Sequence, residues 1–130
     1  MNIFHDISLL NYNTFGIDVK AKALITYDSS KELADMVSKC LPDMPQPVMH
    51  VGEGSNLLFM NDFGGSILVS KIKDVEVIRE TEENVTVRVG SGWVMDDFIS
   101  YSLSRNWYGL ENLSLIPGQV GASAVQNVGA

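Results

Sequence analysis

The stretch VMHVGEGSN, residues 48–56, joins a short apolar run to a glycine-rich turn. The apolar run predicts a strand, and glycines placed directly after a strand let the backbone turn tightly and approach a ligand closely. Successive backbone N–H groups in such a turn form a concave nest that binds an anion without a lysine. The sequence leaves two interpretations open, a phosphate site and a plain turn between strands. The candidate residues are Gly52, Glu53, Gly54, Ser55, Asn56 and Leu57.

This turn differs from the common nucleotide-binding motifs. Leu57 stands where the Rossmann fingerprint needs its third glycine, so a Rossmann dinucleotide site is excluded. The sequence also lacks the G-x-x-x-x-G-K-[ST] motif of phosphate-loop nucleotidases.

On the N-terminal side of this turn, the clearest element is a helix that begins after Ser29. Ser29 and Glu32 form a capping-box pattern, and Pro42 ends the helix. One buried helical face is predicted for Leu33, Met36, Val37, Cys40 and Leu41. With an apolar run at residues 23–25 and strands at 48–51 and 66–70, the predicted order for residues 1–70 is β-α-β-β. Residues 1–12 show no clear period, and residues 61–65 are predicted as a turn.

On the C-terminal side, alternating valines at 75–77 and 85–89 predict two half-buried strands joined by a polar turn at 81–84. A helix is predicted at about 94–105, with Asp96 and Asp97 in its first turn. The fold class is therefore α+β, with one subdomain at 1–70 and a second at 71–130.

A second candidate segment lies at residues 117–130, where small residues predominate. Such a segment lets backbone lie against a flat surface, whereas the valines within it argue against a plain linker. The candidate ligand contacts are Pro117, Gly118, Val120, Gly121, Ala122, Ser123, Gln126, Asn127, Gly129 and Ala130.

Composition excludes several classes of function. Nine basic against sixteen acidic residues, a net charge of -7, argue against a nucleic-acid partner. Cys40 is the only cysteine, so no internal disulfide forms. The sequence has no signal-peptide pattern and no apolar run long enough for a membrane span, which predicts a cytoplasmic protein. No metal or catalytic constellation is recognisable in the spacing of His, Cys and carboxylates.

Four blocks carry a resemblance to a known family: NTFGID at 13–18, GEGSNLLF at 52–59, GLENL at 109–113, and IPG at 116–118 through QNVGA at 126–130. In this order and spacing they resemble the UDP-N-acetylenolpyruvoylglucosamine reductase family. The resemblance implies an FAD-binding domain of the non-Rossmann, vanillyl-alcohol-oxidase-like type. It also implies NADPH as hydride donor and a nucleotide-sugar substrate, which is reduced to UDP-N-acetylmuramate for peptidoglycan synthesis.

The resemblance also implies roles for the two candidate segments. Residues 52–56 would wrap the FAD pyrophosphate, and residues 117–130 would line the flavin ring and ribityl chain. On this basis Gly54→Val is expected to abolish retention of FAD while leaving the fold intact.

The family's proton-donating serine, active-site arginine and late glutamate have no counterpart up to Ala130. We therefore expect the catalytic residues downstream of Ala130 and a truncated, inactive FAD-binding part whose uncovered strand edges favour self-association. Two alternatives remain open, another flavin-dependent oxidoreductase of the same fold and a non-catalytic binding module.

Overall fold

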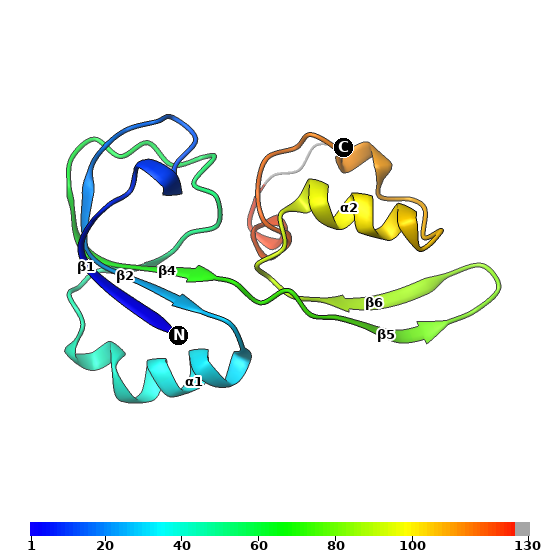
Figure 1. The fold of residues 1–130 in the computed structure, drawn as a ribbon, viewed down its shortest axis with the longest axis horizontal. Coiled ribbons are helices and arrows are strands. Elements are labelled where there is room, and N and C mark those ends of the chain that lie inside the picture. Colours follow the sequence, from blue (N-terminus) through cyan, green and yellow to red (C-terminus); the bar gives the residue numbers. More distant parts are fainter. Residues whose placement is uncertain (127–130) are drawn as a thin grey trace. The chain divides into compact units, whose positions relative to one another are not determined.

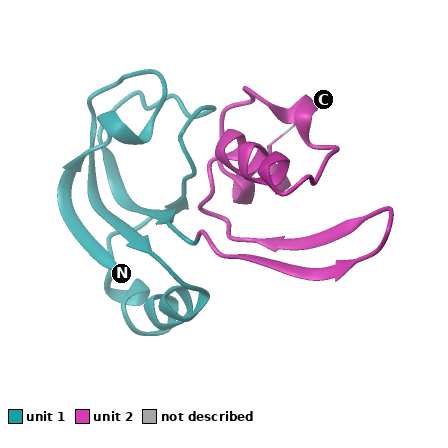
Figure 2. Ribbon diagram, turned by 45° about the vertical axis from the view of Figure 1, so that its right-hand side comes forward, with its two compact units in different colours: residues 1–72 teal, residues 73–130 magenta. Residues whose placement is uncertain are grey.

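A computed structural model describes residues 1–126 of the chain. Contacts divide the chain into two compact units, Met1–Ile72 and Lys73–Ala130 (Figure 2). The first unit, unit 1, is built on a four-stranded sheet in the order β1-β2-β4-β3. Its strands are β1 (Asn2–Ser8), β2 (Lys20–Tyr27), β4 (Phe63–Ser70) and β3 (Val48–His50). β1 pairs with β2 antiparallel, whereas β2, β4 and β3 run parallel to one another.

Both faces of this sheet are covered, because side chains of the central strands alternate between two apolar clusters. On β4, Ile67 and Val69 belong to one cluster and Leu68 to the other. Helix α1 (Ser30–Lys39) covers the Leu68 face through Met36, which is fully buried. Loop segments that include Leu9 and Val51 cover the opposite face, so the sheet lies between α1 and these loops (Figure 1).

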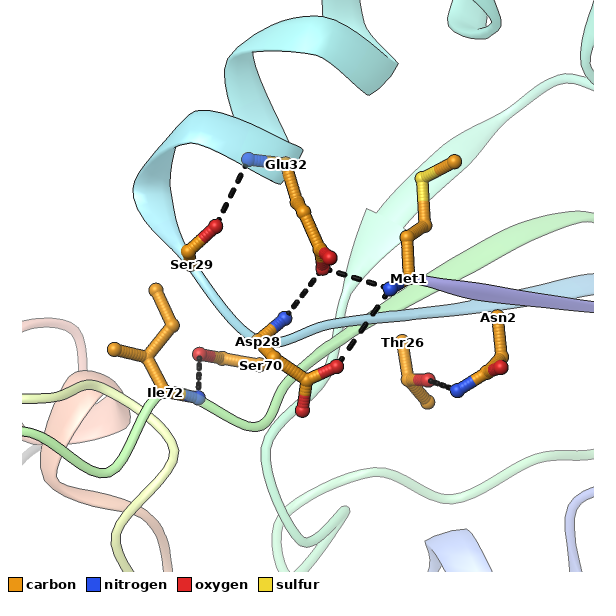
Figure 3. A network of polar contacts seen from close by, with 8 residues as sticks. All are labelled: Met1, Asn2, Thr26, Asp28, Ser29, Glu32, Ser70 and Ile72. Atoms are coloured by element: carbon orange, nitrogen blue, oxygen red, sulfur yellow. Dashed lines mark hydrogen bonds and ion pairs between the residues drawn. The ribbon is translucent and has the colours of Figure 1, made fainter.

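The N-cap predicted at Ser29 is confirmed, while the reciprocal bond of the capping box is donated to Glu32 by Asp28 in place of Ser29. The Ser29 hydroxyl accepts a hydrogen bond from the Glu32 backbone N–H at 3.1 Å. The Glu32 carboxylate accepts from the backbone N–H of Asp28 at 2.9 Å and pairs with the Met1 amino group at 2.8 Å (Figure 3). The helix start is therefore tied to the beginning of β1.

The predicted apolar face of α1 is correct in part. Leu33, Cys40 and Leu41 pack with Met36 against the sheet. The prediction is wrong for Val37, which is 47% exposed because only a narrow stripe of this ten-residue helix meets the sheet. Leu41 lies beyond the helix, in the 3-10 turn Leu41–Asp43.

Two further expectations for unit 1 are corrected. Residues 2–8 form β1, a strand that sequence periodicity did not mark because its first five side chains are all exposed. Residues 63–65, predicted as part of a turn, already belong to β4. A Cβ at Gly65 would collide with the backbone of Pro47. A glycine at this position therefore lets β4 pass close to the segment that precedes β3. The observed order is β-β-α-β-β.

The second unit, unit 2, contains the predicted hairpin and helix. Strands β5 (Val75–Glu80) and β6 (Val85–Val89) pair antiparallel, and their turn is closed by the Thr81 backbone N–H donating to the Asn84 carbonyl at 2.8 Å. Helix α2 (Met95–Ser104) follows, then short 3-10 turns at Glu111–Leu113 and Val120–Ala124. The predicted α+β class is confirmed.

The two tryptophans of unit 2 are packing residues. Trp93 contacts the rings of Phe98 and Tyr101, with ring centroids 6.0 and 5.5 Å apart. Trp107 contacts the other side of this cluster through Tyr101, at 6.1 Å. The aromatic cluster holds α2 to the segments before and after it.

Candidate cofactor site

The glycine loop, residues 52–57, begins where β3 ends. The backbone N–H of Val51 donates to the carbonyl of Leu68 at 2.9 Å, which continues the pairing with β4 up to the loop. The loop is closed by the Leu57 N–H, which donates to the Gly54 carbonyl at 3.4 Å. A rigid parallel strand therefore presents the loop at its carboxyl end, the end at which open α/β sheets bind ligands.

Gly54 is the tightest point of this loop. Its φ of +66° lies in the left-handed region, and a Cβ there would collide with the Tyr12 carbonyl oxygen and lie 2.9 Å from the Cα of Asn13. The glycine is thus required by a contact within the chain. The expectation that Gly54→Val leaves the fold intact is contradicted, since the valine side chain would occupy the position of the residue 12–13 backbone.

The segment that contacts Gly54 is held by Asn13, which is buried. The Asn13 Nδ2 donates to the carbonyls of Leu9 and Ile17 at 2.7 and 2.9 Å. Its Oδ1 accepts from the Ile17 N–H at 3.0 Å. The side chain therefore closes the turn of residues 9–17, together with the backbone bond from the Tyr12 N–H to the Leu9 carbonyl at 2.8 Å. Sequence reasoning left this block without a role, although asparagine close to a glycine is a typical sign of a turn closed by a side chain.

At the carboxyl ends of β2 and β3, Tyr27 and His50 form a pair. The Tyr27 hydroxyl and His50 Nε2 are 2.6 Å apart, and the two rings meet edge to face at 5.6 Å. Tyr27 is buried, whereas His50 is exposed as a whole residue. Desolvation by the surrounding chain lowers the pKa of the His50 imidazole below its ordinary value.

The second candidate segment contributes to an apolar pocket of about 360 Å³ in unit 2. Five of the predicted contact residues line it: Pro117, Gly118, Val120, Ser123 and Gln126. The rest of the lining comes from α2, through Met95 and Phe98, and from Leu110, Leu113, Ile116 and Gln119. The structure therefore brings five of the ten predicted contact residues of this segment together around one cavity.

Gly121 and Ala122 are not part of the pocket lining. A Cβ at Gly121 would lie 2.6 Å from the Ser91 Cβ, so this glycine packs against the turn that follows β6. Asn127, Gly129 and Ala130 lie outside the described residues.

Hydrogen bonds fix the pocket-lining segment to the start of α2. The Met95 N–H donates to the Gly118 carbonyl at 2.9 Å, and the Val120 N–H donates to the Trp93 carbonyl at 2.8 Å. The Asp96 carboxylate accepts from the N–H of Leu115 at 3.0 Å. Bonds within the chain thus anchor the pocket wall at several points along its length.

Within residues 1–126, the structure contains neither a metal-binding cluster nor a membrane-spanning helix. No cluster of three or more His, Cys, Asp and Glu side chains in that range has the arrangement of a metal site. None of the helices described is both long and apolar enough to span a membrane.

Comparison with known proteins identifies relatives for this arrangement. A reductase of Bacteroides fragilis (strain YCH46), named UDP-N-acetylenolpyruvoylglucosamine reductase, is 54% identical over 95% of this chain. A protein of the same name from Porphyromonas gingivalis (strain ATCC 33277) is 45% identical over the whole chain. The chain spans only 36% and 38% of the length of these two relatives.

The fold also has a solved counterpart. The crystal structure of the UDP-N-acetylenolpyruvylglucosamine reductase from Thermus caldophilus matches the whole chain with a TM-score of 0.71, over 44% of that protein and at 24% identity. This likeness concerns the fold.

A family model described as an FAD binding domain matches residues 21–130, which include the glycine loop and the pocket-lining segment. The match covers most of the chain and both candidate segments, so the chain belongs to the FAD binding domain family.

Proposed function

We propose that this chain holds FAD, with the pyrophosphate on the glycine loop and the flavin ring and ribityl chain on residues 117–130. The observation that carries the proposal is the left-handed, tightly packed turn at Gly54, directly after a parallel strand. The candidate contacts remain the six residues of the glycine loop and the ten residues predicted between Pro117 and Ala130.

The glycine loop fits a pyrophosphate through its backbone. Within residues 1–126, no acceptor is described for the backbone N–H groups of Gly52, Gly54 and Asn56. N–H groups gathered in one turn bind an anion without a neighbouring cation. This mode of binding suits a chain with a net charge of -7.

The unit 2 pocket fits an apolar ring. Its volume of about 360 Å³ lies within the range of small-molecule sites, and its lining is mostly aliphatic and aromatic. Ser123 and Gln126 add polar groups at the wall, which would serve to bond the carbonyl and ring nitrogen atoms that a flavin carries.

We further propose that the chain is part of an NADPH-dependent reductase that converts UDP-N-acetylglucosamine enolpyruvate to UDP-N-acetylmuramate in the cytoplasm. The similarity to the Bacteroides and Porphyromonas reductases supports this reading over an oxidase or a non-catalytic module. When bound, a flavin carries hydride between donor and acceptor, and the protein supplies binding and orientation. In this proposal the residues of this chain bind and orient the flavin.

Self-association belongs to the same proposal. The β5–β6 hairpin exposes Val77 and Ile78, which are 44% and 49% exposed. Strand edges that have no hydrogen-bonded neighbour and carry exposed apolar side chains favour pairing with other chains.

Binding of FAD to the 130-residue chain tests the proposal, with riboflavin as the ligand that lacks the pyrophosphate. Asn56→Asp adds one negative charge at an exposed position of the loop and should weaken FAD binding about tenfold, roughly 1.4 kcal/mol, while leaving riboflavin binding unchanged. Asn61→Asp makes the same charge change at an exposed position outside the loop and should have no effect.

Fluorescence titration measures both affinities. Equal affinities for FAD and riboflavin would contradict the pyrophosphate assignment, and an absence of saturable FAD binding would contradict the cofactor. The proposal assigns flavin binding, and not reduction of the sugar, to this chain alone. Oxidation of NADPH by the chain with added FAD, dependent on the enolpyruvyl sugar, would contradict that assignment.

A further inference from the structure

The turn of residues 9–17 and the glycine loop are far apart in sequence, and their backbones approach each other closely at Gly54. The Tyr12 carbonyl oxygen and the Asn13 Cα lie where a side chain at Gly54 would be. Neither group can be displaced by rotating a side chain, because both belong to the backbone. The position of the loop at Gly54 is therefore set by the position of the residue 12–13 backbone.

That backbone is in turn held by the Asn13 side chain and by the Tyr12 N–H, which donates to the Leu9 carbonyl at 2.8 Å. Asn13 is 7% exposed and uses both polar atoms of its amide, spanning from Leu9 to Ile17. Leu9, which supplies one of the carbonyls, is fully buried in the apolar cluster beneath the loop. The amide thus connects a fixed point of the core to the surface on which Gly54 rests.

We infer that Asn13 is a positioning residue for the glycine loop, acting through the Tyr12 backbone without touching the ligand. The inference rests on the proposed function for the identity of the ligand, FAD. It adds that the affinity of the loop for a pyrophosphate depends on an asparagine amide about forty residues earlier in the chain. In a nest, the N–H groups must converge on one anion, so a small displacement of Gly54 weakens several contacts together.

The neighbouring residues of the same turn give a matched control. Asn11 lies two positions before Asn13 and is exposed. Asn11→Ala and Asn11→Asp make the same chemical changes in the same turn without removing the buried amide.

The first experiment uses the 130-residue chain without ligand. Backbone ¹⁵N relaxation reports the motion of residues 52–57 directly. Asn13→Ala should increase the amplitude of motion at these residues and leave the relaxation of the sheet strands unchanged. The Asn11 variants should show the relaxation of wild type throughout. Loop relaxation identical to wild type in a folded Asn13→Ala chain would overturn the inference, whatever the chain binds.

The second experiment measures FAD and riboflavin affinities well below the melting midpoint of each variant. Asn13→Ala should weaken FAD binding at least tenfold and leave riboflavin binding within twofold of wild type. A residue that serves only stability would lower the melting midpoint and leave both affinities of the folded chain unchanged. That outcome would overturn the inference.

Asn13→Asp covers the case in which Asn13→Ala does not fold. It keeps the shape of the side chain and the acceptor for the Ile17 N–H, but it loses the donor to the Leu9 and Ile17 carbonyls. It should show the same selective loss of FAD affinity, and normal FAD affinity in this variant would refute the positioning role. If wild type binds no FAD while the Asn13 variants mobilise the loop, the proposed function fails and the positioning role stands.

Discussion

Gly54 and Gly16 share the same left-handed backbone, with φ of +66° and +67°, but their surroundings differ. A Cβ at Gly54 would meet the backbone of Tyr12 and Asn13, whereas a Cβ at Gly16 would have no atom within 4 Å. Substituting these two glycines therefore separates two contributions to the loss of stability. One is the strain of a left-handed residue that carries a side chain, and the other is the steric overlap of that side chain with a nearby backbone segment.

Gly16→Ala should therefore lower the free energy of unfolding by about 1 kcal/mol, the cost of a left-handed residue that carries a side chain. Gly54→Ala should lower it by about 2–4 kcal/mol, because overpacking adds to the same strain. Urea denaturation of both variants measures the difference. Equal losses would show that the contact between Gly54 and Tyr12 relaxes without cost.

His50 predicts a pH dependence of stability. Burial lowers the pKa of His50 in the folded chain, so the unfolded chain takes up a proton first as pH falls through the ordinary value of 6.5. Proton uptake by the unfolded state favours unfolding, and stability should fall on acidification below about pH 6.5 until the folded imidazole is protonated too.

The variant His50→Gln should flatten this dependence, because glutamine can bond the Tyr27 hydroxyl but does not titrate. Melting midpoints between pH 5 and 8 provide the measurement, with His5→Gln at an exposed position as the control. A slope in His50→Gln as steep as in wild type would assign the pH dependence to other groups.

At the scale of elements, α1 shows how local signals and packing divide their roles. Its start is set by Ser29, whose hydroxyl caps the Glu32 N–H, and by a carboxylate in the first turn. Its packing depends on Met36 and a few partly buried neighbours. Local sequence therefore determines where the helix begins, and packing against the sheet determines which of its side chains are buried.

Ser29→Ala should cost about 1 kcal/mol of stability through loss of the N-cap. Ser38→Ala, in the same helix, is the matched control, because its exposed hydroxyl only bonds carbonyls of the preceding turn. That change should be close to neutral, since alanine is the better helix former. Thermal unfolding compares the two, and FAD affinity should be unchanged in both. An altered FAD affinity in Ser29→Ala with unchanged melting would place α1 near the ligand.

At the scale of the whole molecule, the edges and exposed apolar side chains decide how copies of the chain behave. In the hairpin, Val75 faces Val89 and Val77 faces Val87, while the ion pair between Glu76 and Arg88 alternates with them. One face of this two-stranded sheet is therefore apolar, and two strands alone are too few for such a face to be covered.

The mean mass of the chain in light scattering should therefore rise with concentration. Val77→Lys places a charge on the apolar face and should shift this rise to higher concentration. Met60→Lys makes the same charge change at a residue that is 77% exposed in unit 1, and should have little effect. A monodisperse monomer of wild type at millimolar concentration would contradict self-association.

Much of the chain could be predicted because its signals are local. The capping box at Ser29, the alternating valines of the hairpin and the acidic first turn of α2 each act within a few residues, and each element lies where its signal does. The four sequence blocks likewise indicate the family by residue type and spacing alone.

Other features were decided by contacts between distant residues. β1 exists because backbone groups pair with β2, not because its side chains alternate. Val37 is exposed because the sheet reaches only a narrow stripe of α1. Gly54 is a glycine because the Tyr12 backbone lies against it, and Asn13 is buried because it closes the turn that brings Tyr12 there. A sequence shows which residue types stand at these positions, but only the folded chain shows which atoms exclude or require them.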